Sequence, residues 1–176
     1  MKYLFLCLLL LPAALYAQSS MQVTQNNTVQ ETEAMEQFKA TWSRFADAVL
    51  QRDTATIRAL SAGCIWCSDC KAQAPPAGDD KFIPVAQFLQ HNLPVIFNDA
   101  SQSRLKDPSK LTFTDDTQNR DLYQAPCMRR TERLSRQKEV QLLVVDPSQE
   151  TEGLQQAFSF METPEGYKFC GYSTIP

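Results

Sequence analysis

The hydrophobic positions between residues 35 and 49 recur in alternating steps of three and four. This spacing places them on one face of an amphipathic helix, and they are Met35, Phe38, Trp42, Phe45 and Val49. Asp53 follows the helical pattern and is placed to cap a second, short helix. The inward residues of that second helix are Ile57 and Leu60.

The helical periodicity is interrupted between Cys64 and Asp80. This stretch contains three cysteines, Pro75-Pro76 and a glycine, which indicates a loop or an irregular edge. A third helix is expected to begin near Pro84, because proline suits the first turn of a helix. Pro94 lacks a backbone donor, so it should bend or restart that helix.

The second half of the chain changes its period to two, which is the period of a β-strand. Residues 139–145 are predicted as a strand with apolar residues on both faces. Residues 154–160 form the next predicted strand, and the turn signal Thr163-Pro164-Glu165-Gly166 joins it to a strand over residues 167–175. Residues 122–133 are a further candidate strand. Helices followed by strands predict an α+β fold with the helices on one face of an antiparallel sheet.

This order of elements resembles the nuclear transport factor 2-like superfamily. The resemblance rests on Phe38-x3-Trp42-x2-Phe45-x3-Val49, on Asp53 and Ile57, and on the hairpin from Phe158-Ser159-Phe160 to Gly166-Tyr167-Lys168-Phe169. It covers most of residues 35–176 and implies a cone, in which N-terminal helices pack on a curved antiparallel sheet. In that superfamily the space between helices and sheet is often a ligand pocket. The resemblance implies that such a pocket would be lined here by aromatic residues, namely Trp42, Phe45, Phe97, Phe158, Phe160 and Tyr167. The alternative is that the same side chains simply fill the core.

The chain begins with the pattern of a cleavable secretory signal peptide. Lys2 precedes the apolar run from Tyr3 to Leu11, and small residues follow that run. The run is shorter than the roughly 20 residues that a membrane span needs. We therefore expect a bacterial-type protein that is secreted or periplasmic, with no membrane anchor. Residues 1–17 are predicted as signal peptide, residues 18–33 as a polar, disordered leader, and residues 34–176 as a single α+β domain.

Charge argues against nucleic acid as a partner. The formal net charge of the chain is −3, whereas phosphate binding needs a basic footprint. Cations nevertheless gather close to Lys138, and this candidate anion patch consists of Arg129, Arg130, Arg133 and Arg136. Such a cluster either binds an anionic ligand or partner surface, or forms a solvated edge that discourages strand pairing.

Five cysteines remain when the predicted signal peptide, which contains Cys7, is removed, and they are Cys64, Cys67, Cys70, Cys127 and Cys170. Export favours disulfides, and an odd number of cysteines leaves one thiol. We expect one bridge within the first three and one between Cys127 and Cys170, although a bridge from the loop to either strand stays open. Zinc or iron–sulfur ligation by the three clustered sulfurs is an alternative. Redox chemistry is another, since Trp66-Cys67-Ser68-Asp69-Cys70-Lys71 resembles the thioredoxin active-site pattern but follows a predicted helix rather than a strand.

Two further motifs are weaker. Residues 115–121 offer alternating oxygens for calcium, but Arg120 stands where a calcium loop needs glycine and Pro126 where it needs glutamate. A solvated turn is the better interpretation. His91 is the only histidine, and no nucleophile can be paired with it from the sequence, so it is expected at a surface or a helix end. No residue is assigned a catalytic role.

These observations predict a secreted, non-enzymatic domain that binds a small apolar ligand or a protein partner, without cofactor or metal. The first alternative is a thiol-disulfide redox or metal-binding protein that uses the Cys-x2-Cys-x2-Cys loop. The second alternative is a hydrolase or isomerase with its active site in a cavity. The oligomeric state is left open.

Overall fold

The structure is a computed structural model that describes residues 11–68, 70, 81–116, 137–150 and 152–175, with side chains described from residue 29 onward. The chain divides into two compact units, residues 1–37 and 38–176. Helix α1 (Leu11–Leu50) begins in the first unit, and it includes residues 18–33, for which the sequence predicts a disordered leader. The limits of signal peptide, leader and domain remain predictions. Within the described chain, no helix combines the length and the apolar character needed to cross a bilayer.

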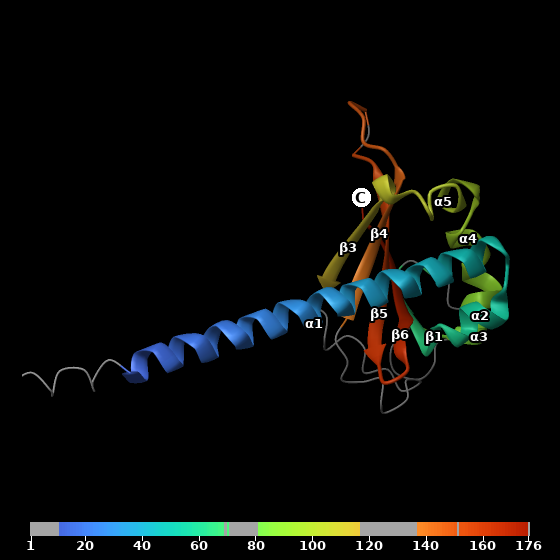
Figure 1. The fold of residues 1–176 in the computed structure, drawn as a ribbon. Coiled ribbons are helices and arrows are strands. Elements are labelled where there is room, and N and C mark those ends of the chain that lie inside the picture. The colour runs from blue at the N-terminus through green and yellow to red at the C-terminus, as the bar shows by residue number, and fades with distance from the viewer. Residues whose placement is uncertain (1–10, 69, 71–80, 117–136, 151, 176) are drawn as a thin grey trace, which may run out of the picture. The chain divides into compact units, whose positions relative to one another are not determined.

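The second unit is built on a sheet of six described strands in the order β2-β1-β6-β5-β4-β3 (Figure 1). The strands are β1 (Ser61–Cys67), β2 (Phe82–Pro84), β3 (Leu111–Asp116), β4 (Gln137–Val145), β5 (Leu154–Thr163) and β6 (Gly166–Ile175). Neighbouring strands are antiparallel, except that β1 runs parallel to β6. The pairing register shifts within β4·β5 and within β5·β6, and such bulges bend and twist a sheet. The predicted α+β class, with helices on a curved sheet, is confirmed.

The part of helix α1 that belongs to the second unit, from Phe38 to Leu50, lies across this sheet in Figure 1. Its apolar stripe has the predicted phase, because Phe38, Trp42, Phe45 and Val49 are all buried. The rings of Phe38 and Phe160 on β5 are in edge contact, with centroids 5.5 Å apart. The other helices are short, and they are α2 (Thr54–Ala59), α3 (Val85–Gln87), the π-helix η1 (Phe88–Asn92), α4 (Leu93–Ile96), α5 (Asp99–Gln102) and the 3₁₀-helix η2 (Pro108–Lys110).

The two prolines act as the sequence predicts. Pro84 is the N-cap of α3, and Pro94 lies in the first turn of α4. Between them the chain makes one wider π-turn, in which the amide of Leu93 donates to the carbonyl of Phe88. A turn of this kind is a local break in the α-helical ladder. The predicted restart of the third helix at Pro94 is therefore confirmed.

The strands β4, β5 and β6 agree with the predicted strands to within a few residues. The predicted turn between β5 and β6 is also present, because Thr163 pairs with Gly166 and its hydroxyl donates to the Gly166 carbonyl at 2.6 Å. Gly166 has a φ of 104°, a conformation that L-residues rarely adopt. The positive φ at this position therefore explains why the turn contains glycine.

Two predictions are corrected by the strands near the sheet edges. Residues 64–67 belong to β1 and not to a loop, because β1 is held between β2 and β6 and is buried along most of its length. Asp115 and Asp116 end β3 instead of opening a solvated turn, and Asp115 pairs with Lys138 of β4. An opposite charge directly across the strands stabilises this register. The rest of the calcium-like motif and the candidate strand at residues 122–133 lie outside the described residues.

Candidate functional site

The aromatic side chains that were predicted to line a ligand space lie together in the second unit. Trp42, Phe45, Phe97, Phe158, Phe160 and Tyr167 are each at most 4% exposed. Phe97 stacks on Phe158 with centroids 5.1 Å apart, and Phe45 meets Phe160 edge to face at 5.6 Å. Their rings therefore pack against one another as a core. Two of the six also border cavities: Phe97 lines one and Trp42 lines another.

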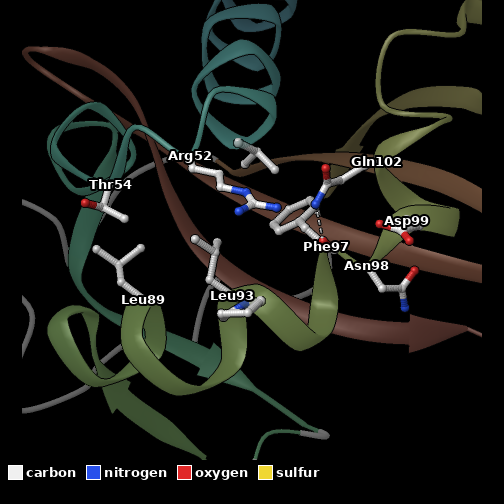
Figure 2. Close-up of a pocket in the computed structure, with 10 residues that line it drawn as sticks. Arg52, Thr54, Leu89, Leu93, Phe97, Asn98, Asp99 and Gln102 are labelled. Atoms are coloured by element: carbon white, nitrogen blue, oxygen red, sulfur yellow. Dashed lines mark hydrogen bonds between the residues drawn. The ribbon is translucent and has the colours of Figure 1, made fainter.

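The larger of these two cavities, which we call the Arg52 pocket, has a volume of about 590 Å³. It lies where the C-terminal end of α1 faces η1, α4 and α5 (Figure 2). Its lining residues are Val49, Arg52, Thr54, Leu89, Leu93, Pro94, Phe97, Asn98, Asp99 and Gln102. Leu89, Leu93 and Phe97 give it an apolar wall. Figure 2 shows the guanidinium of Arg52 extending from the end of α1 toward Phe97 and Gln102.

The end of α1 fixes the backbone of Arg52. The amide of Asp53 donates to the Ala48 carbonyl at 2.8 Å, and the amide of Arg52 donates to the Val49 carbonyl at 3.1 Å. These two bonds form a Schellman motif, in which the residue after the helix adopts a left-handed conformation and is usually glycine. Here that residue is Arg52, with a φ of 55°. The chain therefore keeps a long cationic side chain at a position whose backbone favours glycine.

Asp53 then starts the next helix. Its carboxylate accepts a hydrogen bond from the amide of Thr56 at 3.0 Å and another from the Thr56 hydroxyl at 2.6 Å. The hydrogen bond from the Thr56 hydroxyl lowers the pKa of Asp53 below its ordinary value, and the hydrogen bond from the Thr56 amide adds to this effect. The cap predicted from the sequence is confirmed, and Ile57 and Leu60 of the short helix are buried as expected.

The opposite rim of the pocket is polar. Asn98 caps α5 by accepting a hydrogen bond from the Ser101 amide at 3.2 Å. The amide nitrogen of Gln102 donates to the Phe97 carbonyl at 2.6 Å (Figure 2). Asp99 supplies an exposed carboxylate in the first turn of α5. The rim thus combines fixed amide groups with one negative charge, opposite the cation of Arg52.

A second cavity lies between α1 and β3, and we call it the α1–β3 groove. Its volume is about 440 Å³, and its lining residues are Lys39, Trp42, Ser43, Ala46, Leu105, Lys106, Pro108, Leu111 and Phe113. Among the described residues no acceptor meets the buried Nε1 of Trp42. Lys106 at its rim already pairs with Asp47, with Nζ and Oδ1 2.7 Å apart. The groove is smaller than the Arg52 pocket. The charge of Lys106 at its rim is balanced by Asp47.

Cys67 and Cys70 form a disulfide at the end of β1, with their Cα atoms 5.4 Å apart. The predicted bridge within the cysteine cluster is thereby confirmed, and the sulfurs of this pair are not available as thiolate metal ligands in this state. Cys64 is also disulfide-bonded. The thioredoxin-like motif begins within β1, whose last two residues are Trp66 and Cys67, whereas the sequence predicted a preceding helix.

The predicted bridge between Cys127 and Cys170 is wrong. Cys170 carries a buried thiol, whose Sγ donates to the carbonyl of Ser159 at 3.3 Å. It belongs to a hydrophobic cluster with Ala62 of β1, Phe82 of β2 and Met161 of β5. A disulfide requires two cysteines whose Cα atoms lie within bridging distance in the folded chain. The separation of Cys127 and Cys170 along the sequence therefore does not indicate whether they can pair. Cys127 itself lies outside the described residues.

The remaining predicted sites are scattered or outside the described chain. The candidate anion patch of Arg129, Arg130, Arg133 and Arg136 lies outside the described residues. Lys138 lies on β4 and forms a salt bridge with Asp115. His91 is half-buried in η1, inside the uninterrupted helical run of α3, η1 and α4, and so does not lie at a helix end. In the described part of the chain, no group of three His, Cys, Asp or Glu side chains is arranged to hold a metal ion.

Sequence reasoning missed the residues that shape the Arg52 pocket. The sequence does not reveal that Arg52 adopts a left-handed backbone conformation, because the residue in that position is usually glycine. Gln156 is a polar residue within the predicted strand at residues 154–160, yet it is buried. Its Nε2 donates to the Ile96 carbonyl at 3.1 Å and to the Tyr172 hydroxyl at 3.2 Å. This side chain ties α4, which carries one wall of the pocket, to the sheet.

No family model matches the chain, and no curated protein matches its sequence. Among solved structures, the chain is similar to a candidate dehydratase of the NTF2-like family from Streptomyces avermitilis. The identity is 13%, the TM-score is 0.40, and the match covers 84% of this chain and 97% of that chain. The α+β architecture of the second unit is established by its own strand pairing.

Proposed function

We propose that the second unit is a binding domain that takes a small, mainly apolar molecule into the Arg52 pocket. The observation that carries this proposal is the pocket itself. Its volume of about 590 Å³ falls within the range of roughly 300–1,000 Å³ that is usual for ligand pockets. Its apolar wall and its few fixed polar groups are also the usual composition of such sites.

The packing of the second unit supports this location. The aromatic core between α1 and β5 is filled by ring contacts, so a ligand there would have to displace buried side chains. The Arg52 pocket needs no such displacement, because it is already present between α1 and the η1–α4 segment. Gln156 holds α4 on the sheet, which keeps this wall in place before a ligand arrives.

The chain is proposed to work outside the cytoplasm, as a secreted or periplasmic protein with a nuclear transport factor 2-like cone. The signal-peptide pattern at residues 2–11 supports export. The cysteine chemistry agrees with an oxidising compartment, since Cys67 and Cys70 are joined in a disulfide.

The test compares two neighbouring substitutions on α4. Pro94 lines the pocket, whereas the next residue, Val95, is 72% exposed and lies outside it. Pro94→Trp should place an indole in the pocket and weaken binding of the neutral, polarity-sensitive dye Prodan, and Val95→Trp should leave binding unchanged. Amide shifts in the ¹H–¹⁵N spectrum should map to Leu89 and Gln102. Equal Prodan affinity in both variants, or shifts confined to the α1–β3 groove, would contradict the proposal.

A further inference from the structure

Arg52, the cation that lines the Arg52 pocket, indicates the chemistry of the ligand. Figure 2 shows the guanidinium directed into the pocket and not away from it. Among the described residues, no carboxylate or other acceptor forms an ion pair or a hydrogen bond with this guanidinium. Asp99 shares the pocket lining but is not an ion-pair partner of Arg52.

The contrast with Arg104 shows what the fold does with an arginine that has a structural role. The guanidinium of Arg104 donates to the Leu143 carbonyl at 3.1 Å and pairs with Asp146 at 3.2 Å. It therefore connects the segment after α5 to the end of β4. Arg52 makes no comparable connection with its side chain. Its backbone also holds the left-handed position that would favour glycine in a Schellman motif.

We propose that Arg52 selects the acidic group of the ligand, so that the pocket takes a small monocarboxylic acid with an apolar body. This inference rests on the proposed function of the pocket. A guanidinium donates two parallel hydrogen bonds to a carboxylate, and the two planar groups match in shape. The apolar body would lie against Leu89, Leu93 and Phe97, which form the wall facing Arg52.

Asp99 narrows the class to ligands with a single negative charge. Its carboxylate lies in the pocket lining, where it repels a second anionic group on the ligand. Only one carboxylate of a dicarboxylate could pair with Arg52, and the other would be repelled by Asp99. The pocket therefore discriminates by charge at one end and by apolar surface at the other.

The experiment uses a matched pair of probes, 4-phenylbutanoate and its neutral amide, to displace Prodan from the full chain. The wild type should bind the acid about tenfold more tightly than the amide, because hydrogen bonds to a charged group strengthen binding by this order. Added salt should reduce the preference. Arg52→Gln should bind both probes with equal affinity, and Arg52→Lys should keep a partial preference for the acid.

Arg44→Gln is the matched control, since Arg44 is an exposed cation of α1 that lines neither the Arg52 pocket nor the α1–β3 groove. It should keep the wild-type preference. Equal affinities of acid and amide in the wild type, an unchanged preference in Arg52→Gln, or failure of both probes to displace Prodan would each overturn the inference. If Prodan still binds and Pro94→Trp still weakens its binding, the proposed function survives while the acid selectivity fails.

Discussion

The packing of α1 on the sheet can be tested at Trp42, by replacing it with alanine and, separately, with phenylalanine. Trp42 is 2% exposed, and its ring lies 5.4 Å from that of Phe158 and 6.0 Å from that of Phe45. Trp42→Ala leaves a cavity among these rings, and truncations of this kind lower the free energy of unfolding by about 3–5 kcal/mol. That is a large part of the roughly 5–15 kcal/mol that stabilises an ordinary domain.

Trp42→Phe separates packing from hydrogen bonding at the same position. The indole Nε1 is buried without an acceptor among the described residues, and an unsatisfied buried donor costs about 1–3 kcal/mol. Phenylalanine removes that donor but also loses part of the ring surface. The two effects oppose each other, so we expect Trp42→Phe to destabilise the protein by only about 1 kcal/mol.

Urea unfolding followed by far-UV circular dichroism measures both variants, because tryptophan fluorescence would itself change when Trp42 is replaced. The chain has only two tryptophans, so the remaining signal would report a different site. Equal slopes of free energy against urea would show that the comparison is valid. A loss below about 1 kcal/mol for Trp42→Ala, or equal losses for both variants, would refute the packing argument.

Three further predictions concern the helix ends and the cysteines. Arg52→Gly should raise the free energy of unfolding by up to about 1 kcal/mol, because relief of the left-handed backbone is partly cancelled by the flexibility of glycine in the unfolded chain; a lower urea midpoint would contradict the backbone argument. Asp53 stabilises its cap in the ionised form, so Asp53→Ala should lower the urea midpoint at pH 7, and the difference should shrink as the pH falls below the ordinary pKa of 3.8. A pH-independent difference would show that the carboxylate charge is irrelevant. Peptide mapping of the unreduced, exported protein should find Cys64 joined to Cys127, since Cys7 leaves with the predicted signal peptide; a different partner for Cys64 would refute this pairing.

Sequence patterns were sufficient to predict the elements that depend on neighbouring residues. The apolar stripe from Phe38 to Val49, the cap at Asp53 and the restart at Pro94 are local effects of side-chain periodicity and backbone chemistry. The turn at Gly166 belongs to the same group, because its positive φ is a requirement of that residue alone. Together with the period of two in residues 139–175, these features predicted the α+β class without knowledge of any long-range contact.

The strand β1, the pairing of the cysteines and the Arg52 pocket depend on tertiary structure. The strand β1 depends on pairing with β6, more than 100 residues later in the chain, so its own weak pattern could not reveal it. Cys170 carries a buried thiol within a hydrophobic cluster that strands β1, β2, β5 and β6 form together. The Arg52 pocket forms only when the end of α1 meets η1, α4 and α5. The periodicity of the sequence does not predict this pocket, because the position of each wall is set by the packing of segments that are distant in the sequence.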